Sequence, residues 1–227
     1  MNRYYVKVDT HMIFRSILSG MFIGLGCIFM LVVKSDTDLP KSISALLSGL
    51  VFSIGLYLVL CFSSNLFTGS CINFKNVLAK RMTAFDFVKL LGINYIFNFI
   101  GIAIMAYCGH YIGFSSVSES IAYAKFSKPN DILFVDGFLC NVLVCLAVFL
   151  RNKDVDSSSN TLISVLFTVT MFVACGFEHS IADMFFLFFI NHNIISIAYA
   201  IATLIFISFA NLLGGLFIST LFYYADL

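Results

Sequence analysis

The sequence predicts an all-α membrane protein with six transmembrane helices, the second and fifth of them broken, in one domain over residues 1–227. Three observations predict this class: the composition, six long apolar stretches, and interruptions at matching places in two of these stretches. Hydrophobic residues make up 60% of the chain and charged residues 11%, with a mean hydropathy of +0.99. Soluble domains carry roughly a quarter charged residues. Too few charges are present here to cover a water-facing surface.

Six stretches are long and apolar enough to cross a bilayer, which takes about 20 residues as a helix. They run over 16–33, 42–62, 90–109, 132–150, 160–190 and 193–224. The last two exceed the length of one straight span, so we expect them to tilt, break or re-enter the membrane. The longest connection, over 110–131, is too short to form a separate soluble domain.

Lysine and arginine residues indicate the orientation of the chain, because they are enriched in cytoplasmic loops. A cytoplasmic N-terminus places nine of them inside: Arg3, Lys7, Arg15, Lys75, Lys80, Arg81, Lys89, Arg151 and Lys153. Four then lie outside: Lys34, Lys41, Lys125 and Lys128. This distribution predicts a multi-pass protein of the cytoplasmic membrane with both termini in the cytoplasm.

Polar interruptions occur in two of the predicted spans. Residues 63–70 read Ser-Ser-Asn-Leu-Phe-Thr-Gly-Ser in the second, and residues 175–183 read Cys-Gly-Phe-Glu-His-Ser-Ile-Ala-Asp in the fifth. We expect Gly69 to adopt backbone angles that a helix forbids. With three spans per half, the interruptions occupy matching places in two inverted repeats, about 12–109 and 132–224, which predicts a substrate pathway between them. Two helices kinked for packing alone are the alternative.

Charge and cysteine content argue against several other classes. The formal net charge of +1 gives no reason to expect a nucleic acid or an acidic macromolecular partner. The seven cysteines include no Cys-x-x-Cys pair and no metal-ligand spacing with histidine. We therefore expect no metal and no cofactor, and we expect the cysteines to be small buried apolar side chains.

His179 is the strongest candidate for a functional residue. Ionisable side chains are costly within a membrane and mark functional sites there. Because histidine changes its charge near neutral pH, His179 could donate a hydrogen bond or a proton to a substrate. Thr68, in the other interrupted span, would supply a hydroxyl partner, although capping a helix is its alternative role. Glu178 would tie down its own loop or orient His179.

Four segments, spread in order across nearly the whole chain, carry motifs. They are Leu66–Gly69, Gly137–Ala147, Gly176–Ala182 and Asn211–Gly215. In the same order, they resemble four motifs of the formate/nitrite transporter family: the Leu-Phe-Thr-Gly loop of its second helix, the signature of its fourth helix, its Gly-Phe-Glu-His-Ser-(Ile/Val)-Ala motif, and the Asn-x-x-Gly-Gly break of its sixth helix.

This resemblance implies both an architecture and a function. It implies six helices per protomer in an aquaporin-like inverted repeat, a pore through each protomer, and a homopentamer. The implied substrates are small monovalent anions of weak acids, such as formate, nitrite or hydrosulfide, with the proton as a second partner. Two departures from the family pattern concern the choice of anion. Asn65 stands where the family has an acidic residue, and Asp183 stands where it has asparagine.

The resemblance also implies which residues form the pore. Lys125 precedes Asn141 by sixteen residues, which is the spacing of the family's vestibule lysine. Asn141 belongs to the pathway on this basis, although hydrogen bonding between helices is the alternative. Apolar rings are implied on the cytoplasmic side at Leu56, Leu66 and Phe172, and on the outer side at Phe52, Phe67 and Val144.

General chemistry explains why these residue types suit an anion pathway. A bare anion pays several kcal/mol or more to enter a dry apolar constriction. Lys125 would attract the anion to the outer mouth by its electric field. Loss of hydration then raises the pKa of a weak acid, so that the anion acquires a proton more easily. With His179 between the two rings, we predict proton-linked passage.

Other classes fit the sequence less well. A neutral-solute channel of the aquaporin type shares the architecture, but the paired Asn-Pro-Ala motifs of that family are missing from the sequence. An ammonium transporter would need more spans and paired pore histidines. We predict no enzyme activity, because His179 and Glu178 have no second polar constellation beside them. A structural scaffold would not need a histidine in mid-membrane.

Overall fold

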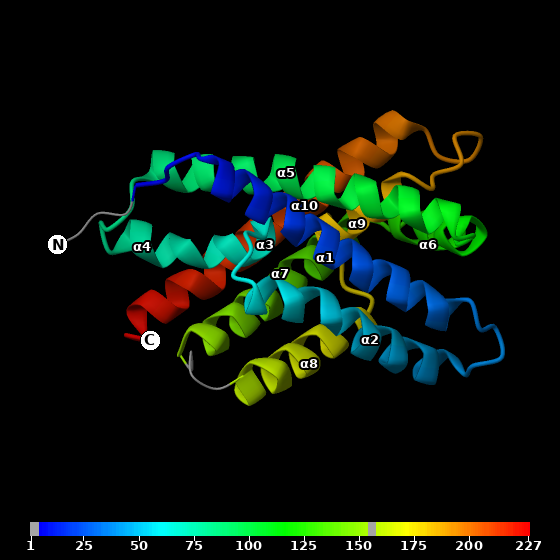
Figure 1. The fold of residues 1–227 in the computed structure, drawn as a ribbon, viewed down its shortest axis with the longest axis horizontal. Coiled ribbons are helices and arrows are strands. Elements are labelled where there is room, and N and C mark those ends of the chain that lie inside the picture. The colour runs from blue at the N-terminus through cyan, green and yellow to red at the C-terminus, as the bar shows by residue number, and fades with distance from the viewer. Residues whose placement is uncertain (1–4, 154–157) are drawn as a thin grey trace.

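The computed structural model describes residues 5–153 and 158–227, and its regular elements are helices (Figure 1). In chain order they are α1 (Thr10–Lys34), α2 (Lys41–Cys61), α3 (Phe67–Ser70), the 3-10 turn η1 (Cys71–Asn73), α4 (Phe74–Leu78), α5 (Ala84–Tyr111), α6 (Ser115–Phe126), α7 (Asn130–Lys153), α8 (Ser158–Ala174), α9 (Ser180–Leu187) and α10 (Ile197–Tyr224). Of the residues counted for the orientation, Arg3 lies outside the described residues, and so does the side chain of Lys153.

Five of these helices, α1, α2, α5, α7 and α10, are long and apolar enough to cross a membrane. The stretch over 160–190 forms two shorter helices instead, α8 and α9, which are joined by the non-helical residues 175–179. The second stretch is divided as well, because α2 ends at Cys61 and α3 begins at Phe67. We call residues 62–66 the first break and residues 175–179 the second break.

The two breaks have the same backbone form. The amide of Ser63 donates to the carbonyl of Leu60, and the amide of Gly176 donates to the carbonyl of Val173, both at 3.1 Å. Ser63 has a φ of 48° and Gly176 a φ of 74°, the left-handed conformation that commonly ends a helix. Gly69 lies inside α3, so the prediction that it supplies the irregular angles is wrong. The irregular backbone lies earlier in the chain, directly after the end of α2 at Cys61, and Ser63 is the residue that adopts the left-handed conformation.

Packing divides the helices into two similar groups. α1 packs against α2 and α5, and α7 packs in the same way against α8 and α10. α2 and α8 join the groups by packing against each other, and the short helices α3 and α9 also touch. Figure 1 shows the short helices near the middle of the bundle. The breaks are therefore held inside the protein, where non-helical backbone can be satisfied.

Two glycines allow the helices within each group to approach closely. A Cβ on Gly101 in α5 would lie 2.0 Å from the carbonyl oxygen of Ile17 in α1. A Cβ on Gly214 in α10 would lie 2.1 Å from the carbonyl oxygen of Phe138 in α7. Because these neighbours are backbone atoms, no side-chain rotation relieves the contact, and the helices would have to separate.

We expect Gly101→Ala to destabilise the protein by about 1–3 kcal/mol or more, the scale of overpacking in a filled core. Gly92→Ala in the same helix is the matched control, since a Cβ on Gly92 has nothing within 4 Å. Alanine there favours the helix by about 1 kcal/mol. Thermal unfolding of both variants in detergent measures the difference. Equal melting temperatures would contradict the close α1–α5 contact.

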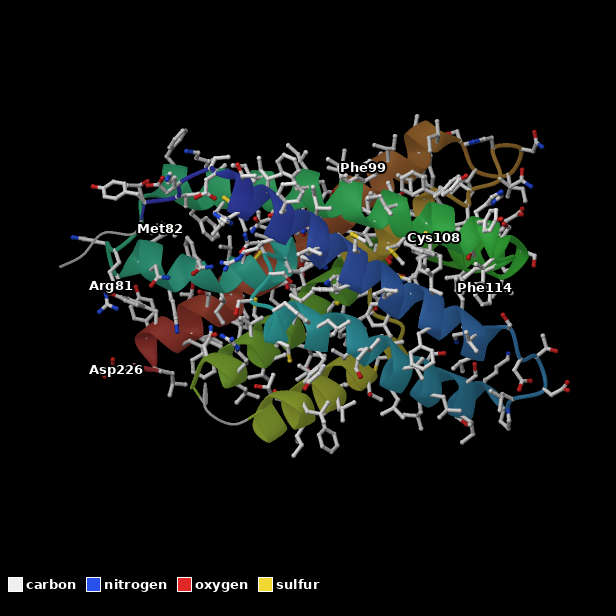
Figure 2. All side chains as sticks on the ribbon, in the orientation of Figure 1. Arg81, Met82, Phe99, Cys108, Phe114 and Asp226 are labelled. Carbon is white, nitrogen blue, oxygen red and sulfur yellow. The ribbon has the colours of Figure 1, made fainter. Side chains whose placement is uncertain are left out.

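The start of α1 and the end of α10 lie at the same end of the bundle (Figure 1). Arg81, Met82 and Asp226 lie at this end, whereas Cys108 and Phe114 lie toward the opposite end (Figure 2). The connection over 110–131 contains the helix α6 at that opposite end. Sequence patterns do not predict α6, because its apolar side chains are too few to form a long stretch.

The cysteines occupy two different environments. Four are buried, Cys27, Cys71, Cys140 and Cys145, and three are exposed, Cys61, Cys108 and Cys175. The prediction that the cysteines are buried is therefore wrong for three of them. The hydropathy of a stretch does not tell which residues face inward, and the outward faces of these helices are apolar as well (Figure 2).

Candidate functional site

Thr68 and His179 bring the two broken regions together. Thr68 Oγ1 lies 2.9 Å from His179 Nε2, and both side chains are buried. His179 also caps α9, since its Nδ1 accepts a hydrogen bond from the amide of Ala182 at 3.1 Å. With Nδ1 accepting, the ring carries its hydrogen on Nε2, so His179 donates to the Thr68 hydroxyl. The structure thus pairs the two residues predicted as partners.

Asn98 on α5 holds the first break in place. Its Nδ2 donates to the carbonyl oxygens of Ser16 in α1, at 2.7 Å, and of Asn65, at 2.9 Å. Its Oδ1 accepts from the amide of Phe67 at 2.9 Å. One buried side chain therefore pairs backbone groups of the break that have no partner within a helix.

Asn211 on α10 holds the second break in the same way. Its Nδ2 donates to the carbonyl oxygens of Gly137 in α7, at 2.7 Å, and of Glu178, at 2.9 Å. Its Oδ1 accepts from the amide of Ser180 at 2.8 Å. Asn98 and Asn211 lie 113 residues apart (98 to 211), the same interval as between the two left-handed residues (63 to 176). This interval is the sequence signal that could have identified the pair.

Asn141 lies beside this arrangement and bridges two helices. Its Nδ2 donates to the backbone carbonyl of Asn211 at 2.7 Å, and its Oδ1 faces the Cys145 thiol at 3.9 Å. Its side chain is completely buried. These contacts match the helix-bridging alternative, and Asn141 is not among the described residues that line the cavity reported below.

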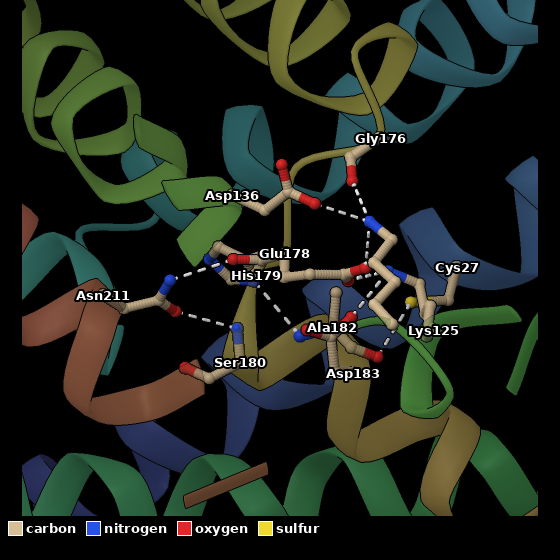
Figure 3. A network of polar contacts seen from close by, with 11 residues as sticks. Cys27, Lys125, Asp136, Gly176, Glu178, His179, Ser180, Ala182, Asp183 and Asn211 are labelled. Atoms are coloured by element: carbon tan, nitrogen blue, oxygen red, sulfur yellow. Dashed lines mark hydrogen bonds and ion pairs between the residues drawn. The ribbon is translucent and has the colours of Figure 1, made fainter. Parts of the chain in front are cut away.

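Two lysines and three carboxylates form a charge cluster on the α6 side of the bundle (Figure 3). Lys125 on α6 pairs with Glu178 and, at 2.8 Å, with Asp183. Lys128 pairs with Glu178 at 2.7 Å and with Asp136 on α7 at 2.6 Å. The charge cluster comprises these five residues, and both Glu178 and Asp183 are completely buried within it.

The charge cluster accounts for Glu178 and Asp183. The carboxylate of Glu178 binds the two lysines, and through these ion pairs it secures the second break. Asp183, which stands where the family pattern has asparagine, is a partner of Lys125. Unpaired buried charges are strongly destabilising, so each carboxylate here depends on its lysine.

Lys128 attaches the α6–α7 connection to the second break. Its Nζ donates to the carbonyl oxygen of Gly176 at 2.7 Å in addition to its ion pairs. Burial lowers the pKa of Lys128, but the carboxylates of Glu178 and Asp136 outweigh burial and leave the pKa raised above its ordinary value. The ammonium therefore stays charged at neutral pH. The sequence indicates only that Lys128 lies in a connection between spans, because Glu178 and Gly176, to which it binds, are distant along the chain.

A cavity of about 270 Å³ connects the charge cluster with His179, whose imidazole contacts Thr68. Three lysines, Lys34, Lys125 and Lys128, contribute to its lining, together with Glu178, Asp183 and His179. The cavity therefore leads from charged side chains to the residue predicted to face a substrate.

Phe52 and Phe172 narrow the space beside His179. Their ring centroids are 6.0 Å apart at 83°, and the ring of Phe172 stacks on His179 at 5.9 Å and 17°. The resemblance implies that Phe172 belongs to the cytoplasmic ring; in the structure Phe172 lies with Phe52 in the lining of the cavity to which Lys125 also contributes. The other ring residues are buried and lie outside this lining: Leu56, Leu66, Phe67 and Val144.

The fold and the site define a membrane transport protein, because two broken spans meet at a buried hydrogen-bonding pair below a cavity lined by lysines. The sequence model of the family described as Formate/nitrite transporter matches residues 6–225. This chain belongs to the formate/nitrite transporter family. The family predicted from the four motifs is thereby confirmed.

Several known members are similar to this chain in sequence. The nitrite transporter NirC of Escherichia coli (strain K12) is 31% identical over 214 residues, which cover 88% of this chain and 77% of NirC. The uncharacterized transporter YrhG of Bacillus subtilis (strain 168) is 34% identical over 182 residues, which cover 74% of this chain and 66% of YrhG. The formate channel FocA of Haemophilus influenzae is 28% identical over 178 residues, which cover 74% of this chain and 62% of FocA.

Solved structures show the same fold. A chain titled FNT family ion channel aligns with a TM-score of 0.87 and 26% identity, over 95% of this chain and 90% of the other. A chain titled pentameric formate channel with formate bound aligns with a TM-score of 0.80 and 25% identity, over 95% and 96% of the two chains. The protein is thus an all-helical membrane protein with the fold of these channels.

Proposed function

We propose that this protein is a channel for small monovalent anions of weak acids, with formate, nitrite and hydrosulfide as the candidate substrates. The observation that carries the proposal is the cavity that joins lysine side chains to the buried His179, whose Nε2–H group donates to Thr68. The named relatives support the class of substrate, since they include a nitrite transporter and a formate channel.

The cavity suggests how an anion enters. Positive charge in a cleft with low-dielectric walls raises the local concentration of anions. The anion then meets Phe52 and Phe172, where it loses hydration, and this loss raises the pKa of its acid. A proton from solution then converts it to the neutral acid. Flux is proton-linked for this reason.

His179 acts in this scheme as a hydrogen-bond donor. Its Nδ1 is held by the Ala182 amide, so the group free to exchange partners is Nε2–H. A substrate that reaches the imidazole replaces the Thr68 hydroxyl as acceptor, and Thr68 becomes its second hydrogen-bonding partner. This exchange compensates for hydration that the substrate loses beside Phe172, since a buried acceptor without a partner is costly.

The membrane arrangement follows from the same features. α8 and α9 together form one more crossing, which makes six, and an even number of crossings agrees with the start of α1 and the end of α10 lying at one end of the bundle (Figure 1). We place this end in the cytoplasm because most of the lysines and arginines belong to its connections. Outward-facing apolar side chains contact lipid and neighbouring protomers of a homopentamer, the assembly named for the solved formate channel.

Uptake into proteoliposomes tests the proposal. Formate, nitrite and hydrosulfide are offered at fixed total concentration while the external pH is varied, with empty vesicles as the control. We expect uptake to rise as the pH falls, because the concentration of neutral acid rises, and to exceed that of empty vesicles severalfold. Passage of water or glycerol without any of the three anions would instead assign the chain to the neutral-solute class.

A further inference from the structure

The two lysines of the charge cluster already have partners of opposite charge. Lys125 contacts Glu178 and Asp183, and Lys128 contacts Glu178 and Asp136. An ammonium that is already paired with a carboxylate attracts an anion less strongly from a distance, because the two charges partly cancel. Capturing an anion at Lys125 would also mean separating it from carboxylates that are completely buried.

Lys34 is the third lysine that lines the same cavity, and it differs from the other two. It is the last residue of α1 and is half-buried. Across residues 5–153 and 158–227, no ion pair or side-chain hydrogen bond involves Lys34. The nearby Asp36 carboxylate accepts the amide of Asp38 at 2.9 Å instead.

We propose that Lys34 is the residue that captures the anion at the entrance to this cavity, an inference that rests on the proposed channel function. Its ammonium has three unused donors, which can form charge-assisted hydrogen bonds to a small anion without breaking an ion pair. Lys125 and Lys128 then have a different task, which is to hold Glu178 and the second break in shape.

The last residue of a helix is a suitable place for such a group. Backbone carbonyls at the end of α1 carry partial negative charge, which favours a lysine at this position even when no acid pairs with it. The anion is therefore the strong partner that Lys34 lacks. Because the position is half-buried, binding there is reversible, as transport requires, whereas a completely buried ion pair would hold the anion.

Formate uptake by three variants in proteoliposomes tests this inference. Lys34→Gln removes the charge, and Lys34→Arg keeps it. Lys41→Gln is the matched control, because Lys41 is exposed at the start of α2, at the same end of the bundle, and does not line the cavity. The concentration for half-maximal uptake and the maximal rate are measured at low and high ionic strength.

We expect Lys34→Gln to raise the formate concentration for half-maximal uptake on the order of tenfold at low salt, because the charge of Lys34 raises the local concentration of the anion. The maximal rate should be nearly unchanged, because it is measured when the site is already saturated. The difference shrinks at high salt as the charge is screened. Lys34→Arg and Lys41→Gln are expected to resemble the wild type. Equal values for Lys34→Gln and Lys41→Gln, with a conducting wild type, would overturn this inference alone. A wild type that passes no anion would overturn it together with the proposed function.

Discussion

Replacing His179 with asparagine is expected to reduce formate uptake about a hundredfold while the protein stays folded. Asparagine is a favourable N-cap, so it can accept the Ala182 amide as His179 Nδ1 does. It is too short to place a donor where Nε2 lies, 2.9 Å from Thr68. Removing one hydrogen-bond donor from the oxyanion hole of an enzyme costs about two to three orders of magnitude in rate, and we expect the lower end of this range for the loss of this donor. Uptake into proteoliposomes at low external pH measures the loss.

The matched control for this variant is His110→Asn. His110 is exposed near the end of α5, so the same substitution there removes an imidazole without touching the cavity. Thr68→Val, which keeps the shape but removes the hydroxyl, is expected to reduce uptake less than His179→Asn does. Wild-type uptake by a folded His179→Asn variant, judged by its melting temperature, would rule out His179 as the donor in the pathway.

The largest loss of stability is expected from Asn211→Leu. Leucine is close in size to asparagine but leaves the carbonyl of Glu178 and the amide of Ser180 without partners inside the protein. Each unsatisfied buried group costs about 1–3 kcal/mol, so the total is a large share of the stability of an ordinary domain. We expect the variant to unfold many degrees below the wild type, or to yield no folded protein in detergent.

Asn98→Leu is expected to have a similar effect, because Asn98 satisfies the equivalent groups of Asn65 and Phe67. Asn193→Leu serves as the control, since Asn193 is exposed and its side chain makes no hydrogen bond recorded in the described structure. If Asn211→Leu melts at the same temperature as Asn193→Leu, the asparagine does not hold the second break, and the geometry of the site has another cause.

Local sequence features predicted the parts of the fold that depend on neighbouring residues. The apolar stretches place the five long helices, since hydropathy is summed over consecutive residues. The cost of a buried imidazole identified His179, and the hydroxyl in the other interruption identified Thr68 as its partner. Four motifs predicted the family, which the match over residues 6–225 confirms.

Features that depend on distant contacts could not be predicted in the same way. The ion pairs of Lys128 join it to Asp136 and Glu178, and no local pattern marks that triplet. Ser63 adopts a left-handed backbone conformation that is usually found at glycine. The sequence therefore led to the wrong prediction that the irregular residue was Gly69, which lies inside α3. The contact between the rings of Phe52 and Phe172 joins α2 to α8, and only the assembled bundle brings these two helices together.

The two breaks share one backbone form but carry different charges, and this difference affects how transport depends on direction. Asn65 stands 113 residues before Glu178 (65 to 178) and is held by the equivalent asparagine, yet only Glu178 belongs to a charge cluster. Fixed charges do no net work on a solute that crosses completely, so they cannot make the pathway a pump. Fixed charges do set the local concentration of the anion at each entrance of the pathway. The channel is therefore expected to rectify, with influx and efflux saturating at different concentrations although both run to the same equilibrium.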